Sequence, residues 1–284
     1  MQFIHISDPH VDVLASHYGI DAARRFASAV VHAVARAPQA AFIAVTGDLT
    51  HNADEASYRF VQQTLSHAPC PSFVIPGNHD DPDVMAGVFR RTASVELNAL
   101  DPREGGVWTD VLYAEGADAL FLNTHEAGSA AGVVPPEGKR LLETMLMAGN
   151  DRGLFVFMHH PPFESGIAAM DAAGLANAEV LVQTFEERRA TPTGIFCGHL
   201  HRTMFGLWQG VPVWCQRSTA HQVDPQTSQH ETIGYCRETP EYGVVTYTRS
   251  HGGRATILSQ SVPFENSEFF IDRSRTGLQS ATMR

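Results

Sequence analysis

The sequence lacks the features that mark several common classes of protein. In 284 residues it has four cysteines and no Cys-x-x-Cys pair, so neither a zinc knuckle nor a redox-active pair is predicted. We interpret the four as free thiols of a reducing cytoplasm, with a disulfide among the last three left open: Cys70, Cys197, Cys215 and Cys236. No apolar run approaches the roughly 20 residues of a membrane span, so no membrane partner is predicted. The first apolar run begins almost at Met1, which leaves no room for a signal peptide.

Positive charge is also scarce. The chain has 20 Lys and Arg against 31 Asp and Glu, a formal net charge of −11, and no run of basic residues. We therefore predict no nucleic-acid polymer as a partner, because such polymers are bound through clustered positive charge. A small anionic phosphate stays compatible with an acidic protein if metal ions supply the local positive charge.

Histidine is abundant, with fifteen residues, and its placement is more informative than its number. The apolar run 72–75 predicts a buried strand, and Pro76-Gly77 ends it abruptly. Asn78, His79 and Asp80 therefore lie at the carboxyl end of a strand, where ligand sites in open α/β sheets tend to occur.

Four other apolar runs are followed in the same way by Asp or His. The predicted strands cover residues 3–6, 41–45, 153–158 and 193–197. The polar residues that end or follow them are Asp8 and His10, Asp48, His159, and His199 and His201.

Carboxylate, imidazole and amide oxygen together suit Mn, Fe, Co or Zn. The five sites supply seven ligands, which is too many for one ion but suits two ions that share a bridge. The bridge must be a carboxylate, because a neutral imidazole offers one lone pair, and Asp48 stands between the two ligand groups in chain order. Two ions about 3.5–4 Å apart can clamp a phosphorus centre and activate a bridging hydroxide as the nucleophile.

In this order the motifs resemble those of the calcineurin-like metallophosphoesterase superfamily. The stretches IPGNHDD, FMHHPPF and FCGHLH are similar to those of bacterial class III cyclic-nucleotide phosphodiesterases and glycerophosphodiesterases. The resemblance spans Asp8 to His201 and implies a two-sheet β-sandwich flanked by helices. It also implies how the ligands divide: Asp8, His10, Asp48 and His201 for one ion, and Asp48, Asn78, His159 and His199 for the other.

The resemblance implies a metal-dependent phosphodiesterase that acts on small phosphodiesters, either cyclic nucleotides such as 3′,5′-cAMP or glycerophosphodiesters. Alternatives are a phosphomonoesterase, another small-substrate metallophosphoesterase, or a non-catalytic binding module on the same fold. His79 is expected to contact substrate with Asn78 and to assist the leaving group, with Asp80 accepting its other ring N–H. Related enzymes are oligomers, so a homo-oligomer is expected.

The rest of the chain predicts one α/β catalytic domain over residues 1–260 and a tail over 261–284. Further strands are expected at 107–113, 119–123, 204–208, 211–216, 242–249 and 255–260. Helices are expected at 21–37, from Asn52 with Glu55 as a capping pair, and at 84–89, 135–147 and 179–189. Residues 164–178 read as a loop. The long polar segment 216–240 is expected to border the site or a subunit contact.

Other histidines are interpreted as structural or solvated rather than catalytic. For His160 a place directly behind the ligands stays an alternative. The group comprises His5, His32, His51, His67, His125, His160 and His221.

Overall fold

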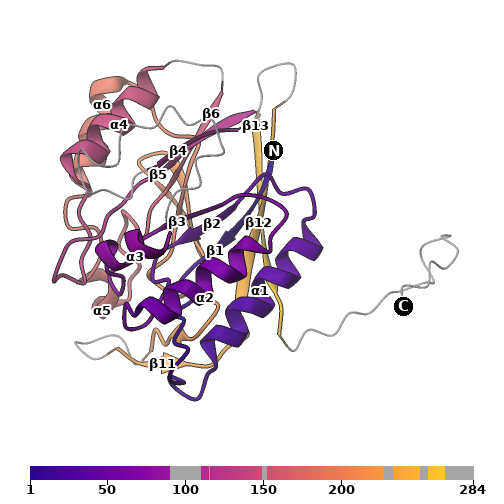
Figure 1. The fold of residues 1–284 in the computed structure, drawn as a ribbon. Coiled ribbons are helices and arrows are strands. Elements are labelled where there is room, and N and C mark those ends of the chain that lie inside the picture. The colour runs from indigo at the N-terminus through magenta and orange to yellow at the C-terminus, as the bar shows by residue number, and fades with distance from the viewer. Residues whose placement is uncertain (90–109, 115, 149–151, 227–232, 250–254, 266–284) are drawn as a thin grey trace, which may run out of the picture.

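A computed structural model describes residues 1–89, 110–114, 116–148, 152–226, 233–249 and 255–265. Two β-sheets lie face to face, and helices cover the outer side of each (Figure 1). The predicted two-sheet α/β sandwich is confirmed. Among the described residues, no helix is both long and apolar enough to cross a membrane.

Within the described residues, the first sheet has five strands, and the three nearest to the amino terminus are parallel to one another. Its order is β13 (Ala255–Pro263), β12 (Glu241–Arg249), β1 (Gln2–Ile6), β2 (Ile43–Thr46) and β3 (Ser72–Ile75). Strands β1, β2 and β3 are parallel, whereas β12 is antiparallel to both β1 and β13. Strands from both ends of the described chain therefore build this sheet.

The second sheet has six strands, and its central strands are also parallel. Its order is β4 (Asp110–Ala114), β5 (Ala117–Phe121), β6 (Gly153–Phe157), β7 (Gly194–Cys197), β9 (Val211–Cys215) and β8 (Met204–Trp208). A short antiparallel pair, β10 (Gln222–Val223) and β11 (Tyr235–Cys236), stands apart from both sheets. Residues 107–109 of one predicted strand lie outside the described residues.

Aromatic side chains fill the layer between the sheets. Phe3 of β1 packs on Phe155 of β6 and Phe196 of β7, with ring centroids 5.8 Å and 5.1 Å away. Successive residues of a strand point to opposite faces, so Ile4 and Ile6 turn toward the helices instead. This alternation produces three clusters, one between the sheets and one under each set of helices.

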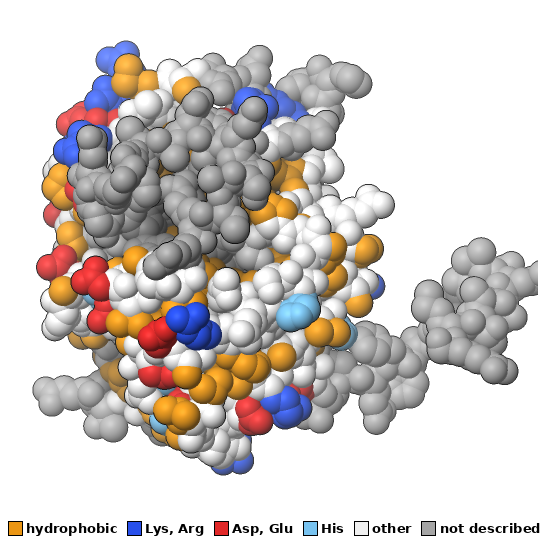
Figure 2. Space-filling view, viewed as in Figure 1, with side chains coloured by type: hydrophobic (Ala, Val, Ile, Leu, Met, Phe, Trp, Pro, Cys, Tyr) orange, Lys and Arg blue, Asp and Glu red, His pale blue; other side chains and the backbone are white. Residues whose placement is uncertain are grey.

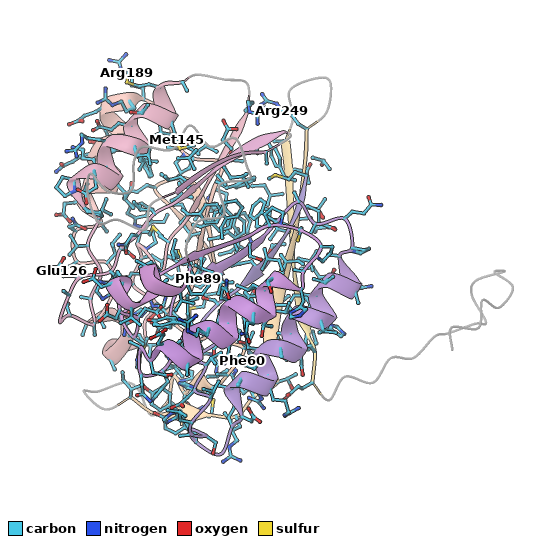
Figure 3. All side chains as sticks on the ribbon, viewed as in Figure 1. Phe60, Phe89, Glu126, Met145, Arg189 and Arg249 are labelled. Carbon is cyan, nitrogen blue, oxygen red and sulfur yellow. The ribbon has the colours of Figure 1, made fainter. Side chains whose placement is uncertain are left out.

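In the described part of the chain, three helices cover the first sheet and three lie over the second. They are α1 (Ala22–Arg36), α2 (Glu55–Ser66) and α3 (Pro82–Val88), and then α4 (Pro136–Met147), α5 (Ala168–Asp171) and α6 (Glu179–Arg188). Figure 3 labels Phe60 on α2 and Met145 on α4, which pack against the two outer clusters. Helix α1 lies within the predicted range 21–37, and Asp21 caps it, because its carboxylate accepts the Arg24 N–H.

Some predicted boundaries were wrong. Helix α2 begins at Glu55 and is capped by Asp54, whose Oδ1 accepts the Ser57 N–H, whereas the Asn52 amide donates to Asp12 Oδ2 at 2.9 Å. The loop predicted at 164–178 contains α5, a single turn too short to show periodicity in the sequence. Strand β13 continues to Pro263, opposite Glu241, whereas the predicted strand ends at residue 260. Residues 266–284 of the predicted tail lie outside the described residues.

Candidate metal centre

The loops that follow five strands meet at one edge of the two sheets. Those after β1, β2 and β3 come from the first sheet, and those after β6 and β7 come from the second. All seven predicted ligands lie in these loops, and the structure brings them together in two groups that share one residue: Asp8, His10, Asp48, Asn78, His159, His199 and His201.

The first group consists of Asp8, His10, Asp48 and His201, whose candidate ligand atoms lie within 4.8 Å of one another. His10 Nε2 is 3.0 Å from His201 Nε2 and 3.2 Å from Asp48 Oδ2. His201 Nε2 is also 3.5 Å from Asp8 Oδ1. All four residues are buried.

The second group is centred on the amide oxygen of Asn78. His159 Nε2 lies 3.2 Å from Asn78 Oδ1, and His199 Nδ1 lies 3.1 Å from the same atom. Asp48 Oδ1 is 3.5 Å from His159 Nε2. Asp48 therefore faces both groups, one with each carboxylate oxygen.

The protonation pattern of these rings leaves lone pairs that face one another. The Nδ1–H of His159 donates to Thr46 O at 2.8 Å, and that of His201 donates to His221 O at 2.8 Å. The Nε2 atoms of both rings are then unprotonated and point at carboxylate, amide or imidazole acceptors. His199 Nε2 and His10 Nδ1 are buried with no hydrogen-bond partner. His159 Nε2 faces Asn78 Oδ1 and Asp48 Oδ1, and His201 Nε2 faces Asp8 Oδ1, with no proton between these atoms, so they repel one another. Cations between them would remove the repulsion, so these residues fit metal ions.

The electrostatics of the buried groups agree with this interpretation. Burial lowers the pKa of His10 and His159, brings that of His199 to about 3, and lowers that of His201 well below its usual range. The rings are therefore neutral, as metal ligands must be. Burial and the charge of Asp48 raise the pKa of Asp8 well above its usual range. Bound cations would favour the ionised form.

The backbone at the ligands is unusual. Five ligands have left-handed backbone angles, with φ between 42° and 68°: Asp8, His10, Asp48, His199 and His201. This conformation costs about 1–2 kcal/mol for a residue other than glycine, and it persists only where surrounding contacts enforce it. Backbone bonds between loops do so here, such as His10 N–H to Asp48 O at 2.9 Å.

Glycines in the same motifs allow close packing. A Cβ atom on Gly77 would overlap Asp48 Oδ1, and one on Gly198 would overlap Ser7 Oγ and lie 2.6 Å from Asp8 Oδ2. These positions accept no side chain without moving a ligand.

The predicted contact between Asp80 and the His79 ring is wrong. The buried Asp80 carboxylate accepts the backbone N–H of Gly77 and Leu49 on Oδ2, and the Thr50 N–H and Tyr58 hydroxyl on Oδ1, at 2.9–3.2 Å. Burial and Asp48 raise the pKa of Asp80 to about 7. Asp80 thus fixes the turn that carries Asn78 rather than acting on the substrate.

His79 lies at the surface of the site, as its predicted role requires. Its Nδ1–H donates to the backbone oxygen of His51 at 3.1 Å, which leaves Nε2 for another partner. Its backbone N–H donates to Asp48 Oδ1 at 2.9 Å. Asn78 and His79 also line a hollow of about 250 Å³ together with Gly128, Ser129 and Ala130.

Sequence reasoning missed two histidines beside the centre. The ring of His51 lies 5.6 Å from His10 and 5.4 Å from His79. The ring of His221 lies 5.0 Å from His10 and 4.7 Å from His201. His51 follows the Asp48 motif by three residues, which is a usable signal, whereas His221 belongs to the unpatterned segment 216–240.

His160 takes the alternative position that the sequence left open. Its Nδ1 is 2.9 Å from Thr124 Oγ1 and its Nε2 is 3.2 Å from Ala130 O. Its ring packs on those of His159 and His199, with centroids 4.7 Å and 4.8 Å away. His160 therefore supports two ligand rings.

The beginning of segment 216–240 lies against the ligand loops. Ser218 Oγ donates to Asp8 O at 2.6 Å, and the Thr219 N–H donates to Ser7 O. Residues 227–232 of this segment lie outside the described residues.

The four cysteines are free in the structure, as predicted.

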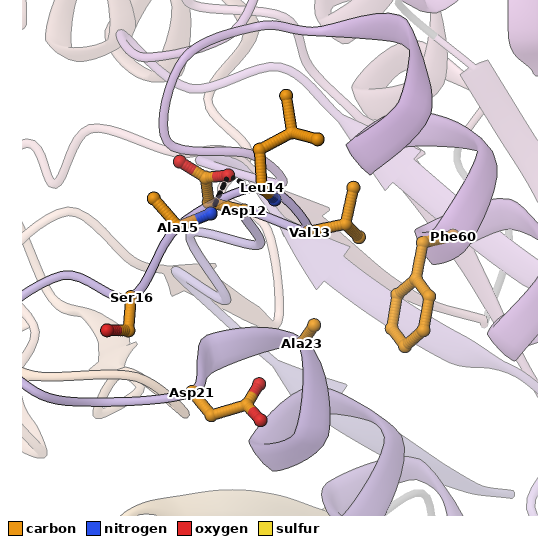
Figure 4. Close-up of a pocket in the computed structure, with 8 residues that line it drawn as sticks. All are labelled: Asp12, Val13, Leu14, Ala15, Ser16, Asp21, Ala23 and Phe60. Carbon is orange, nitrogen blue, oxygen red and sulfur yellow. Dashed lines mark hydrogen bonds between the residues drawn. The ribbon is translucent and has the colours of Figure 1, made fainter.

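A second hollow, of about 510 Å³, is larger than the one beside His79, and none of the proposed ligands lines it. It lies between the loop after the first ligand pair and the helices α1 and α2, and Figure 4 shows its lining: Asp12, Val13, Leu14, Ala15, Ser16, Asp21, Ala23 and Phe60. The Asp12 carboxylate accepts the backbone N–H of Leu14 and Ala15 and is therefore already engaged.

On the face shown in Figure 2, the described Lys and Arg side chains are scattered rather than gathered into a patch.

Comparisons with known proteins agree with this geometry. A family model described as calcineurin-like phosphoesterase matches residues 1–203. A probable cyclic nucleotide phosphodiesterase of Rhodopseudomonas palustris is 33% identical over 87% of this chain and 88% of its own. A probable glycerophosphodiester phosphodiesterase of Arcobacter nitrofigilis is 24% identical over 89% and 90%. The crystal structure of a Danio rerio dimetal phosphatase superimposes with a TM-score of 0.66 at 12% identity, covering 93% of this chain and 99% of that one, which shows a shared fold.

Proposed function

Because the chain belongs to the calcineurin-like phosphoesterase family, we propose that it is a phosphodiesterase that uses two transition-metal ions to hydrolyse small phosphodiesters. One relative is named for cyclic nucleotides and another for glycerophosphodiesters, which supports these as the two substrate classes. The alternatives are a phosphomonoesterase and a non-catalytic binding module on the same fold.

The position of Asp48 is the observation that carries this proposal. Its Oδ2 lies 3.2 Å from His10 in the first group, and its Oδ1 lies 3.5 Å from His159 in the second. A carboxylate can offer each oxygen to a different ion, so Asp48 is the proposed bridge. The other proposed ligands are Asp8, His10 and His201 for the first ion, and Asn78, His159 and His199 for the second.

When bound, the ions would neutralise phosphate charge and make water acidic enough to act as a nucleophile near neutral pH. The chain's own residues position the substrate. Asn78 and His79 line the 250 Å³ hollow and so would contact a phosphodiester that enters it. The His51 carbonyl holds His79 Nδ1–H, which leaves Nε2 to assist the leaving oxygen or to hold a phosphate oxygen.

Hydrolysis of bis(p-nitrophenyl) phosphate by the metal-stripped protein, with each of Mn, Fe, Co and Zn restored in turn, tests the reaction class. We expect metal-dependent release of p-nitrophenolate. If none of the four metals gives any hydrolysis, the binding module is favoured. Faster hydrolysis of p-nitrophenyl phosphate than of the diester would favour the monoesterase.

Metal analysis of two variants tests the bridge. Asp48→Ala should lose both ions, because the remaining ligands face only one group each. Asn78→Ala should weaken mainly the second ion and regain activity in excess Mn²⁺. Two tightly bound ions in Asp48→Ala would show that the bridge is assigned wrongly. Asp81→Asn is the matched control, since Asp81 caps α3 and faces neither group.

A substrate panel of 3′,5′-cAMP, 2′,3′-cAMP and glycerophosphocholine distinguishes the two substrate classes.

We further propose a cytoplasmic location, which the four free thiols support, and a homo-oligomeric assembly, which the solution mass of the purified protein tests. The metal is one of Fe, Mn, Zn or Co, and elemental analysis of protein purified without added metal would identify it.

A further inference from the structure

Two tyrosines that no ligand role accounts for lie beside the metal centre. Tyr18 and Tyr235 expose 46% and 39% of their surface. Their ring centroids are 4.7 Å apart with an angle of 36° between the planes. Tyr18 comes from the segment after the first ligand pair and Tyr235 from β11, so the fold brings together two rings that are far apart in the sequence.

These rings connect directly to the ligands. Both tyrosine rings contact His221, with centroids 4.9 Å and 4.8 Å away. The His221 ring in turn lies 5.0 Å from His10 and 4.7 Å from His201. Only the His221 ring therefore separates the tyrosine pair from His10 and His201. A substituent of a phosphate bound at these ligands would lie close to the two tyrosine rings.

The pair is held in place by the segment that carries Tyr235. Strand β11 pairs with β10, with Tyr235 opposite Val223. The Glu238 N–H donates to Gln222 Oε1 at 2.8 Å. The Arg237 side chain crosses Gly19, where a Cβ would lie only 2.5 Å from its Nη2. This contact places a guanidinium over Gly19, the residue that follows Tyr18 in the chain.

We propose that Tyr18 and Tyr235 form a stacking platform for a nucleobase, which makes nucleoside phosphodiesters, rather than glycerophosphodiesters, the preferred substrates. The proposal rests on the proposed phosphodiesterase function and deepens it. Aromatic side chains stack on the π-face of any base. The same rings can hold a quaternary ammonium group such as choline, but the positive charge of Arg237 opposes a second cation there.

Two chromogenic diesters with the same leaving group test the platform. They are thymidine 5′-(p-nitrophenyl phosphate) and methyl p-nitrophenyl phosphate, which differ only in the nucleoside. In Tyr18→Leu and in Tyr235→Leu, we expect kcat/KM for the nucleoside diester to fall about 5- to 150-fold, mainly through KM, because one stacked ring is lost. The methyl diester should be unaffected. The two Tyr→Phe variants keep the rings and lose only a hydroxyl group, so their loss on the nucleoside diester should be much smaller than that of the Leu variants.

A binding measurement separates the platform from catalysis. Calorimetry with adenosine 5′-monophosphate and with inorganic phosphate should show weaker nucleotide binding in the Leu variants and unchanged phosphate binding. If neither diester is hydrolysed by the wild type, the proposed function fails, while the binding measurement still tests the platform. Phe205→Leu is the control, because Phe205 is an exposed aromatic residue on β8 that packs on Trp214.

Three results would overturn the platform. Equal losses on both diesters would mean a general structural role. Unchanged nucleotide binding and kinetics in both Leu variants would mean that the rings do not touch the substrate. A larger loss on glycerophosphocholine than on the nucleoside diester would mean that the rings bind a choline cation instead.

Discussion

Replacing Asp80 with asparagine distinguishes a residue that holds the site together from one that takes part in the reaction. The two carboxylate oxygens of Asp80 receive four donors, from the backbones of Gly77, Leu49 and Thr50 and from the Tyr58 hydroxyl. Asparagine keeps the shape but replaces one oxygen with an NH₂ group, which can only donate. Two of the four donors must then face another donor.

The cost follows from which oxygen is replaced. The NH₂ group is tolerated best at the Oδ1 position, because the Tyr58 hydroxyl can rotate and accept from it, and only the Thr50 N–H loses its partner. That orphaned donor costs about 1–3 kcal/mol, and weakening the Gly77 and Leu49 bonds from charged to neutral acceptors costs about 1 kcal/mol each. We expect the free energy of unfolding of the metal-loaded protein to fall by about 3–5 kcal/mol.

Urea unfolding of the metal-loaded protein measures this change, with metal content followed in parallel. Asp81→Asn is the adjacent control, because Asp and Asn cap a helix about equally well, and it should leave stability unchanged. If Asp80→Asn unfolded at the same urea concentration as the wild type and lost activity only on alkyl diesters, Asp80 would act through the His79 ring, and the structural reasoning would be refuted.

Three further predictions concern the centre itself. His79→Ala should keep both ions and lose about 10²–10⁴-fold of its activity on alkyl diesters but clearly less on bis(p-nitrophenyl) phosphate, whose leaving group needs little assistance. Equal losses in kcat/KM would leave His79 as a phosphate-binding residue only. Gly198→Ala should lower metal content and stability, because its Cβ would overlap Ser7 Oγ and displace Asp8, whereas Gly206→Ala, with open space around it, should not lower metal content. Chelation should lower the melting temperature and Mn²⁺ should restore it, because the converging acceptors repel one another without a cation; an unchanged melting temperature would contradict this.

Much of the fold could be predicted because its signals are local. The apolar runs of β1, β2, β6 and β7 are short and buried at almost every residue, as expected of parallel strands covered on both faces, whereas β3, at the edge of its sheet, alternates between buried and half-buried residues. A ligand that closely follows such a strand must lie near the carboxyl end of that strand. The convergence of His159 and Asn78 could therefore be expected from the sequence.

The features that sequence analysis missed depend on contacts between distant segments. Asp80 binds the N–H groups of Leu49 and Thr50, about thirty residues earlier, rather than its neighbour His79. The left-handed backbone of Asp8 is imposed by neighbouring loops and has no signature in residue type. His221 reaches the centre through an unpatterned segment whose path is set by contacts such as Ser218 Oγ to Asp8 O.

The order of strands in the first sheet has a consequence for synthesis of the protein on the ribosome. Strand β1, which leads into Asp8 and His10, pairs on one side with β2 and on the other with β12. When every proposed ligand up to His201 has been synthesised, the nascent chain still lacks β12. One edge of β1 is then unpaired. The sheet is therefore complete only after translation passes Pro263, the end of β13, and until β12 pairs with β1 the exposed edge of β1 can aggregate with other chains or bind a chaperone.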